Sequence, residues 1–267
     1  MRSITSTYRT AFAIAIDLSG SMSEMIHYKR AMRSKAEAAK DVINIFIAEM
    51  LERARREEGV RDYYDLAIWG YAGDSTSSLL GSEKSPFVSI CQVERLSLEQ
   101  SDKTPFKWIK SEASGLTPMY EVLWQIDKHI AEWCRQNQNS HPPLVINITD
   151  GEATDCEWQW LVRISEQIKS HSTYGGNVQL INVHLSSEVG ATSLIFPTLE
   201  EIISSNNHYV MALNSSASYM PSSLQEAICA IKGISPNEQR FKSIAYNASI
   251  EELLSILNIG SISVKRG

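Results

Sequence analysis

The sequence lacks an excess of basic residues, a long apolar run and an apolar leader. Among its 267 residues, 25 Lys and Arg stand against 31 Asp and Glu, which gives a formal net charge of -6. Such a balance leaves no electrostatic footprint for nucleic acid or an acidic membrane. No apolar stretch is long enough to cross a bilayer, and the first residues have no secretory core. We therefore expect a soluble, cytoplasmic protein that binds neither nucleic acid nor membrane.

Closely spaced cysteines and several common catalytic motifs are also missing. The four cysteines, at positions 91, 134, 156 and 229, show no C-x-x-C spacing, which argues against a zinc site or a redox pair. Reduced thiols are the default for a cytosolic protein. The chain contains no G-x-S-x-G elbow, no G-x-G-x-x-G turn and no P-loop. These absences argue against a serine hydrolase, a dinucleotide-binding enzyme and a P-loop NTPase.

The segment from residue 11 to residue 23 organises the rest of the chain. An apolar run, typical of a central parallel strand, stops at Asp17 and opens into a turn rich in hydroxyl groups. Asp17, Ser19 and Ser21 alternate along this turn, so a chain that curls round a cation can direct all three side chains inward. Gly20 supplies the backbone freedom for that curl. One carboxylate and two hydroxyls suit a hard cation such as Mg²⁺, which prefers oxygen ligands in an octahedral shell.

Two later stretches offer further oxygen ligands. Thr117 lies immediately before Pro118, which is well placed at the first position of a helix. A second apolar strand, residues 144 to 150, again ends at an aspartate, Asp150, which Gly151 follows. Ligands of open parallel sheets gather at the carboxyl ends of the strands, so Asp17 and Asp150 point at one rim.

Each of these residues also has an ordinary structural interpretation. Ser21 and Glu24 form an S-x-x-E capping box, and an isolated Asp17 or Asp150 could end a strand or cap a helix. Unrelated caps, however, have no reason to fall at two strand ends in this order. The combination therefore favours a single site over separate caps.

At these residues the sequence resembles the von Willebrand factor type A (VWA) family, over roughly residues 10 to 215. The metal-ion-dependent adhesion site of that family is written Asp-x-Ser-x-Ser, then Thr, then Asp. Asp17, Ser19, Ser21, Thr117 and Asp150 fill these positions in order. Leu116 departs from the family, whose members often have a second glycine before the threonine. The resemblance implies a Rossmann-like α/β fold: a doubly wound, mostly parallel sheet of about six strands, one an antiparallel edge strand, with helices on both faces.

The resemblance also implies a function. The two serines and Thr117 would touch the metal, and Asp17 and Asp150 would close its shell partly through water. One open position would accept an Asp or Glu carboxylate from a partner protein. Mg²⁺ is the expected cation, with Mn²⁺ and Ca²⁺ as alternatives. Intracellular bacterial members of the family often accompany AAA-type ATPases, kinases or phosphatases in stress-response or defence clusters, so the expected function is an interaction module and not an enzyme.

Two other functions remain open at this point. Phosphoesterases with an aspartyl nucleophile also begin with an Asp after an apolar strand, but they need a second Asp where this chain has Ser19, and a Lys partner that the sequence does not identify. Glu152 and His184 are the available general bases, whereas His129 reads as a surface or core residue. A scaffold that works without metal is the other alternative.

The pattern of apolar residues predicts the order of elements. We expect an N-terminal extension over residues 1–10, a VWA domain over 11–233 and a C-terminal extension over 234–267 packed on that domain. The expected strands cover residues 11 to 17, 64 to 71, 86 to 94, 144 to 150, 178 to 185 and 208 to 213. The expected helices cover residues 25 to 58, 118 to 134, 155 to 169, 198 to 205, 221 to 232 and 249 to 257, with a short one between 97 and 114.

Overall fold

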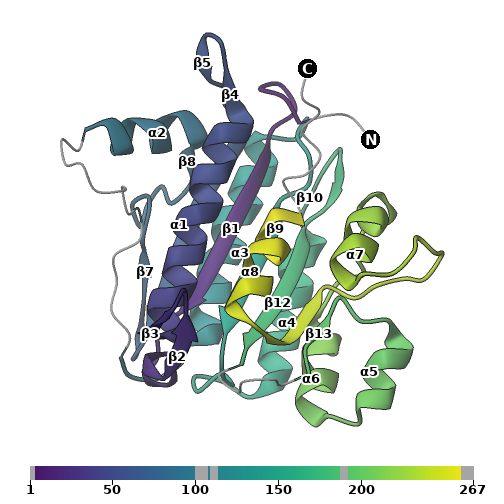
Figure 1. The fold of residues 1–267 in the computed structure, drawn as a ribbon. Helices are drawn as coiled ribbons and strands as arrows, with labels where there is room; N and C mark the ends of the chain where they lie inside the picture. The colour runs from purple at the N-terminus through teal and green to yellow at the C-terminus, as the bar shows by residue number, and fades with distance from the viewer. Residues whose placement is uncertain (1–3, 100–107, 109–113, 187–191, 260–267) are drawn as a thin grey trace.

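A mostly parallel sheet forms the centre of the molecule (Figure 1). The computed structural model describes residues 4–99, 108, 114–186 and 192–259. Within them the sheet has eight strands in the order β13-β14-β12-β9-β1-β6-β7, with β8 also paired to β6. The strands are β1 (Thr10–Asp17), β6 (Tyr64–Ala72), β7 (Ser75–Ser78), β8 (Val88–Ser89), β9 (Leu144–Thr149), β12 (Gln179–Leu185), β13 (Leu194–Ile195) and β14 (Ile244–Ala248).

The five central strands run parallel, and β7, β8 and β13 pair antiparallel at the margins. The predicted α/β class with helices on both faces is confirmed. The helices are α1 (Lys35–Ala54), α2 (Ile90–Leu98), α3 (Met119–Gln136), α4 (Trp158–Ser170), α5 (Leu199–Ser205), α6 (His208–Ser216), α7 (Gln225–Lys232) and α8 (Ile250–Asn258). Short hairpins join β2 (Met25–Tyr28) to β3 (Ala31–Ser34), β4 (Arg55–Arg56) to β5 (Gly59–Val60) and β10 (Ser172–Thr173) to β11 (Gly176–Asn177).

Strand β1 contributes to both halves of the core, which explains why its sequence is apolar without alternation. Phe12, Ile14 and Ile16 pack in the cluster that contains α1 and α8. The alanines between them pack in the cluster that contains α3 and α4. Figure 1 shows the sheet between these two helical layers. Because β1 is packed on both faces, its carboxyl end is held firmly, and Asp17 has a fixed position at that edge of the sheet.

The predicted helix over residues 25 to 58 is wrong at its beginning. Residues 25 to 34 form the β2–β3 hairpin, and α1 begins at Lys35. Met32, which lies four residues before the buried Ala36 and so fits a helical spacing, is 57% exposed. The true start is marked by a capping box, in which the Ser34 hydroxyl accepts from the backbone of Glu37 and the Glu37 carboxylate accepts from the backbone of Ser34.

Two predicted strands are also replaced by helices. Of the strand predicted over 86 to 94, only β8 remains, because Ser89 and Gln92 form a capping box that begins α2. The strand predicted over 208 to 213 is helix α6, whose first turn is capped by the Asn207 side chain. β8 pairs antiparallel with β6, but the antiparallel strands at the two edges of the sheet are β7 and β13. The short helix predicted between 97 and 114 falls largely outside the described residues.

Both ends of the chain contribute to the domain more closely than predicted. The segment predicted as a C-terminal extension supplies β14, which lies between β12 and β13 inside the sheet, and α8, which packs against α1. Near the N-terminus, Ile4 is buried in the core and Arg9 forms an ion pair with Asp65. In the part of the chain that the structure describes, no helix is long and apolar enough to cross a membrane.

Candidate functional site

Asp17 lies at the end of β1 with its carboxylate out of contact with water. One carboxylate oxygen accepts a hydrogen bond from the backbone N–H of Ser19 at 2.8 Å, and the other accepts from the hydroxyl of Thr149 at 2.8 Å. Burial raises the pKa of Asp17, and the hydrogen bonds from Ser19 and Thr149 oppose that rise. A carboxylate that has lost its water is stabilised by any cation that approaches it.

The turn after Asp17 brings the two serine hydroxyls together. Ser19 is buried, Ser21 is exposed, and their Oγ atoms are 3.1 Å apart. The Ser21 hydroxyl also donates to Oδ1 of Asp150 at 2.6 Å, which joins the ends of β1 and β9. Ser21 makes no capping hydrogen bond to the turn that follows it, and the cap of α1 belongs to Ser34. The capping interpretation of Ser21 is therefore wrong.

The loop before α3 packs directly on this turn. The backbone N–H of Gly20 donates to the carbonyl of Gly115 at 2.8 Å, and that of Ser114 donates to the carbonyl of Leu18 at 2.7 Å. Leu116 departs from the family pattern without opening the loop, because its side chain points outward, 61% exposed. Thr117 follows, buried, and its backbone N–H donates to the hydroxyl of Thr154.

Gly115 permits a second close approach of the same loop, to Gly73 in the turn between β6 and β7, whose backbone N–H donates to the carbonyl of Leu116 at 2.9 Å. The φ of Gly115 is +78°, and a Cβ atom there would lie 2.7 Å from the Cα of Gly73. We expect Gly115→Ala to lower the free energy of unfolding by about 2 kcal/mol, from left-handed strain and backbone collision together. The control is Gly233→Ala, at φ +66° in open space, which carries the strain alone and should cost about 1 kcal/mol. Equal losses in urea denaturation would show that the contact between the loops is dispensable.

Asp150 is held by two groups from the first part of the chain. Its side chain is fully shielded from water, with Ser21 on Oδ1 and the ammonium of Lys35 2.5 Å from Oδ2. The same ammonium lies 2.9 Å from a carboxylate oxygen of Glu24. Although burial acts to lower it, the pKa of Lys35 is raised by its hydrogen bonds to Asp150 and Glu24. Lys35 is therefore a charged and almost buried cation at the rim.

Sequence reasoning missed Lys35, because a helix over 25 to 58 makes it an ordinary residue of the helix interior and not the first residue of α1. The signal that could have located it is the second S-x-x-E pattern, Ser34 to Glu37, which sets the helix start at Lys35. Asp155, the first residue of the helix predicted over 155 to 169, lies before α4 and accepts from the backbone N–H groups of Tyr120 and Glu121 at the start of α3. It thus stabilises the helix that follows Thr117.

The oxygen atoms at this rim fit a hard divalent cation. Neighbouring ligands of an octahedral Mg²⁺, at about 2.1 Å from the metal, are separated by about 3.0 Å, and the Ser19 and Ser21 hydroxyl oxygens are 3.1 Å apart. Two carboxylates lie beside this pair: Asp150 accepts from the Ser21 hydroxyl, and Asp17 accepts from the backbone N–H of Ser19. Within the described ranges, no group of three His, Cys, Asp or Glu side chains is placed to hold a metal. The candidate site thus depends on hydroxyl ligands.

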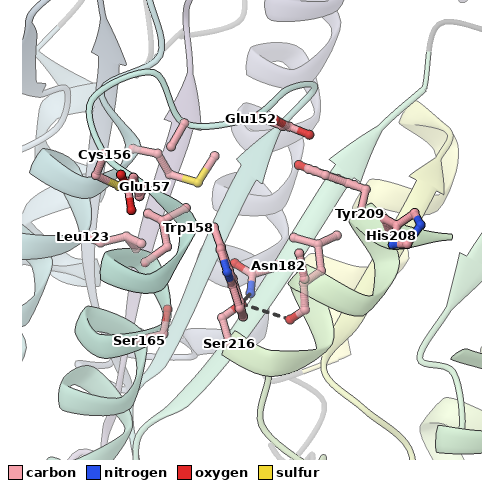
Figure 2. A pocket seen from close by; sticks show the side chains of 15 residues that line it. Leu123, Glu152, Cys156, Glu157, Trp158, Ser165, Asn182, His208, Tyr209 and Ser216 are labelled. Atoms are coloured by element: carbon pink, nitrogen blue, oxygen red, sulfur yellow. Dashed lines mark hydrogen bonds between the residues drawn. The ribbon is translucent and has the colours of Figure 1, made fainter. Parts of the chain in front are cut away.

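A separate cavity of about 510 Å³ opens between α4, α6 and the loop after Asp150. Figure 2 shows its side chains, among them Glu152, Cys156 and Trp158. Burial raises the pKa of the Cys156 thiol to about 11, so at neutral pH it is protonated and a poor nucleophile. His184, which the sequence offers as a general base, is stacked on Tyr246 with ring centres 4.8 Å apart. Neither residue is arranged as an activated catalytic group.

No protein-family model matches the chain, and no curated protein matches its sequence. Similar solved structures include the manganese-loaded TRAP protein of Plasmodium vivax, with 13% identity, a TM-score of 0.45 and coverage of 94% of this chain and 72% of that one. A von Willebrand factor type A protein from Catenulispora acidiphila has 17% identity and a TM-score of 0.44, over 67% of this chain and 34% of that one.

A third similar structure is the PilB minor pilin of Streptococcus sanguinis, with 11% identity and a TM-score of 0.48 over 96% of this chain and 60% of that one. The chain therefore spans only part of the length of each of these proteins. Likenesses this distant carry no argument about what the chain binds.

Proposed function

We propose that the chain is a metal-dependent protein interaction module. A divalent cation, Mg²⁺ in the first place and Mn²⁺ or Ca²⁺ as alternatives, is held by Ser19, Ser21 and Thr117, with Asp17 and Asp150 closing its shell partly through water. Few charges then touch the cation directly, so it keeps a strong attraction for an Asp or Glu carboxylate of a partner. The observation that carries the proposal is the spacing of the two serine hydroxyls, 3.1 Å, beside a buried carboxylate.

The finer parts of the proposal rest on the sequence resemblance alone. They are a bacterial stress-response or defence setting, and an AAA-type ATPase, kinase or phosphatase as partner. A cytoplasmic location is also proposed, and it rests on the cysteine usage of the sequence instead. A complex purified with such a partner should dissociate on addition of a chelator and reform with excess Mg²⁺. A complex that survives chelation unchanged would favour the metal-independent scaffold.

No observation favours the phosphoesterase alternative. The position where that class needs a second aspartate carries Ser19, whose side chain is buried and contacts Ser21. The lysine at the rim, Lys35, pairs with Asp150 and Glu24. Phosphatase activity on a generic aryl phosphate that disappears in Asp17→Asn would reverse this preference.

The first experiment is a calorimetric titration of Mg²⁺ and Mn²⁺ into chelator-treated protein. We expect saturable binding to one site, lost in both Asp17→Ala and Thr117→Ala, because each removes an oxygen ligand. The matched control is Thr7→Ala, an exposed threonine that precedes β1 at the opposite end of the strand. Binding that persists in the Thr117 variant would remove the loop before α3 from the site.

A further inference from the structure

The β2–β3 hairpin delivers a lysine to the rim of the candidate site. This hairpin lies between the serine turn and α1, beside the arrowhead of β1 in Figure 1. At its base, the backbone N–H of Lys35 donates to the carbonyl of Glu24 at 3.0 Å. The side chain of Lys35 is only 5% exposed and reaches Asp150. The hairpin therefore brings a positive charge to a carboxylate that is 115 residues away in the sequence.

The helix itself does not favour a lysine at this position. Lys35 is the first residue of α1, where unpaired N–H groups and the helix dipole favour negative charge and oppose a cation. Burial adds a second cost, because an ammonium group loses its water. The ion pairs with Asp150 and Glu24, at 2.5 and 2.9 Å, are what compensate for both. The lysine is thus held by the rim and not by its own helix.

The contacts of Asp150 show what the ammonium does. Ser21 occupies one oxygen of that carboxylate and Lys35 the other. The Ser21 hydroxyl therefore fixes one oxygen of Asp150, and the ion pair with Lys35 at the other balances its negative charge. A divalent cation that enters beside Ser21 meets this positive charge at short range, where repulsion between cations is strong.

We propose that Lys35 is an internal cation of the candidate site, which stabilises Asp150 in the absence of metal and weakens the binding of a divalent cation. This inference rests on the proposed function. It gives the site two alternative sources of positive charge: the lysine, which is always present, and the metal, which binds when its concentration is high enough to overcome the repulsion. Metal occupancy would then respond to concentration instead of being permanent.

The test replaces Lys35 by methionine, which keeps the length of the side chain and removes its charge. We expect Lys35→Met to bind Mg²⁺ and Mn²⁺ at least tenfold more tightly than the wild type in calorimetry. Without metal it should unfold at a lower temperature than the wild type, because the buried Asp150 has lost its partner. Excess Mg²⁺ should raise the unfolding temperature of this variant more than that of the wild type.

The matched control is Lys29→Met, which removes an exposed lysine at the tip of the same hairpin. Its metal affinity should equal that of the wild type, and its unfolding temperature should change only slightly, because it loses the contact of its ammonium with the Tyr28 ring, 5.0 Å away. Equal affinity in Lys35→Met and the wild type would overturn the inference and leave the proposed function standing. Absence of metal binding in both would overturn the two together.

A second measurement on the wild type covers the case in which Lys35→Met does not fold. The side-chain ¹⁵N signal of Lys35, observed by NMR in chelator-treated protein, should shift when Mg²⁺ saturates the site, because a divalent charge has entered beside the ammonium. A Lys35 signal that stays in place at saturation would contradict the inference. The signal of Lys29 serves as the internal reference and should not move.

Discussion

Asp17→Asn is expected to bind Mg²⁺ and Mn²⁺ on the order of 100-fold more weakly than the wild type, and to unfold at no lower temperature. The substitution keeps the shape of the side chain and removes a negative charge that would face the cation. It also removes the cost of burying that charge, which is why stability should not fall. The amide oxygen can still accept from the backbone of Ser19, and the Thr149 hydroxyl can donate to the carbonyl of Gly151 instead.

Calorimetry with both metals and thermal unfolding in the presence of a chelator measure the two halves of this prediction. Asp74→Asn is the control, because Asp74 is exposed and should change neither quantity. An affinity close to that of the wild type would show that Asp17 serves only to hold Ser19 and Thr149. A large loss of stability would show instead that the charge of Asp17 is needed for folding, through its hydrogen bonds from Ser19 and Thr149.

The elements that the sequence predicted correctly are those whose burial leaves a local pattern. Strands β1, β6 and β9 are buried on both faces, so most of their residues are apolar. Two of their buried polar exceptions, Asp65 in β6 and Asn147 in β9, accept hydrogen bonds from Trp133 and Tyr71. Helix α3 places its apolar side chains against the sheet at three- and four-residue steps, and it lies where this spacing predicted. In these segments the positions that the local pattern marks as apolar are the positions that the fold buries.

Residues 25 to 34 show how such a pattern can mislead. Met32 continues the helical spacing of Ala36 and Ala39, but it faces solvent, and the inward side chain of the hairpin is that of Tyr28. Two turn residues, Lys29 and Arg30, adopt positive φ, which no residue preference in the sequence signals. The hairpin is instead selected by packing of Tyr28 on the core and by the cap at Ser34.

The candidate site likewise has a part that the sequence predicts and a part that it does not. Asp17, Ser19 and Ser21 lie on one turn, and Asp150 ends a strand beside it, so strand order alone brings these side chains together. The partnership of Lys35 and Asp150 depends on the path of the hairpin, a feature of tertiary structure without a local pattern. A buried ion pair of this kind can be found only once the chain between its partners has been traced.

Phe12→Ala is expected to lower the free energy of unfolding by about 4 kcal/mol. Phe12 is completely buried, with its ring 5.5 Å from that of Phe46 and 6.0 Å from that of Tyr64, both in edge-to-face contact. Truncation removes these aromatic contacts and leaves a cavity between β1 and α1 that the rigid sheet cannot close. Urea denaturation measures the loss, and Leu98→Ala, at a 74% exposed position, should change it by less than about 0.5 kcal/mol.

The same variant also tests whether packing in the core affects metal binding at the candidate site. Phe12 lies five residues before Asp17 in a strand paired on both sides, so the rim should keep its geometry while the molecule remains folded. We therefore expect the metal affinity of Phe12→Ala, measured well below its unfolding temperature, to match that of the wild type. A reduced affinity would mean that the cavity shifts β1 and that this shift reaches Asp17. The strand would then couple the core to the site, instead of serving as a rigid support for it.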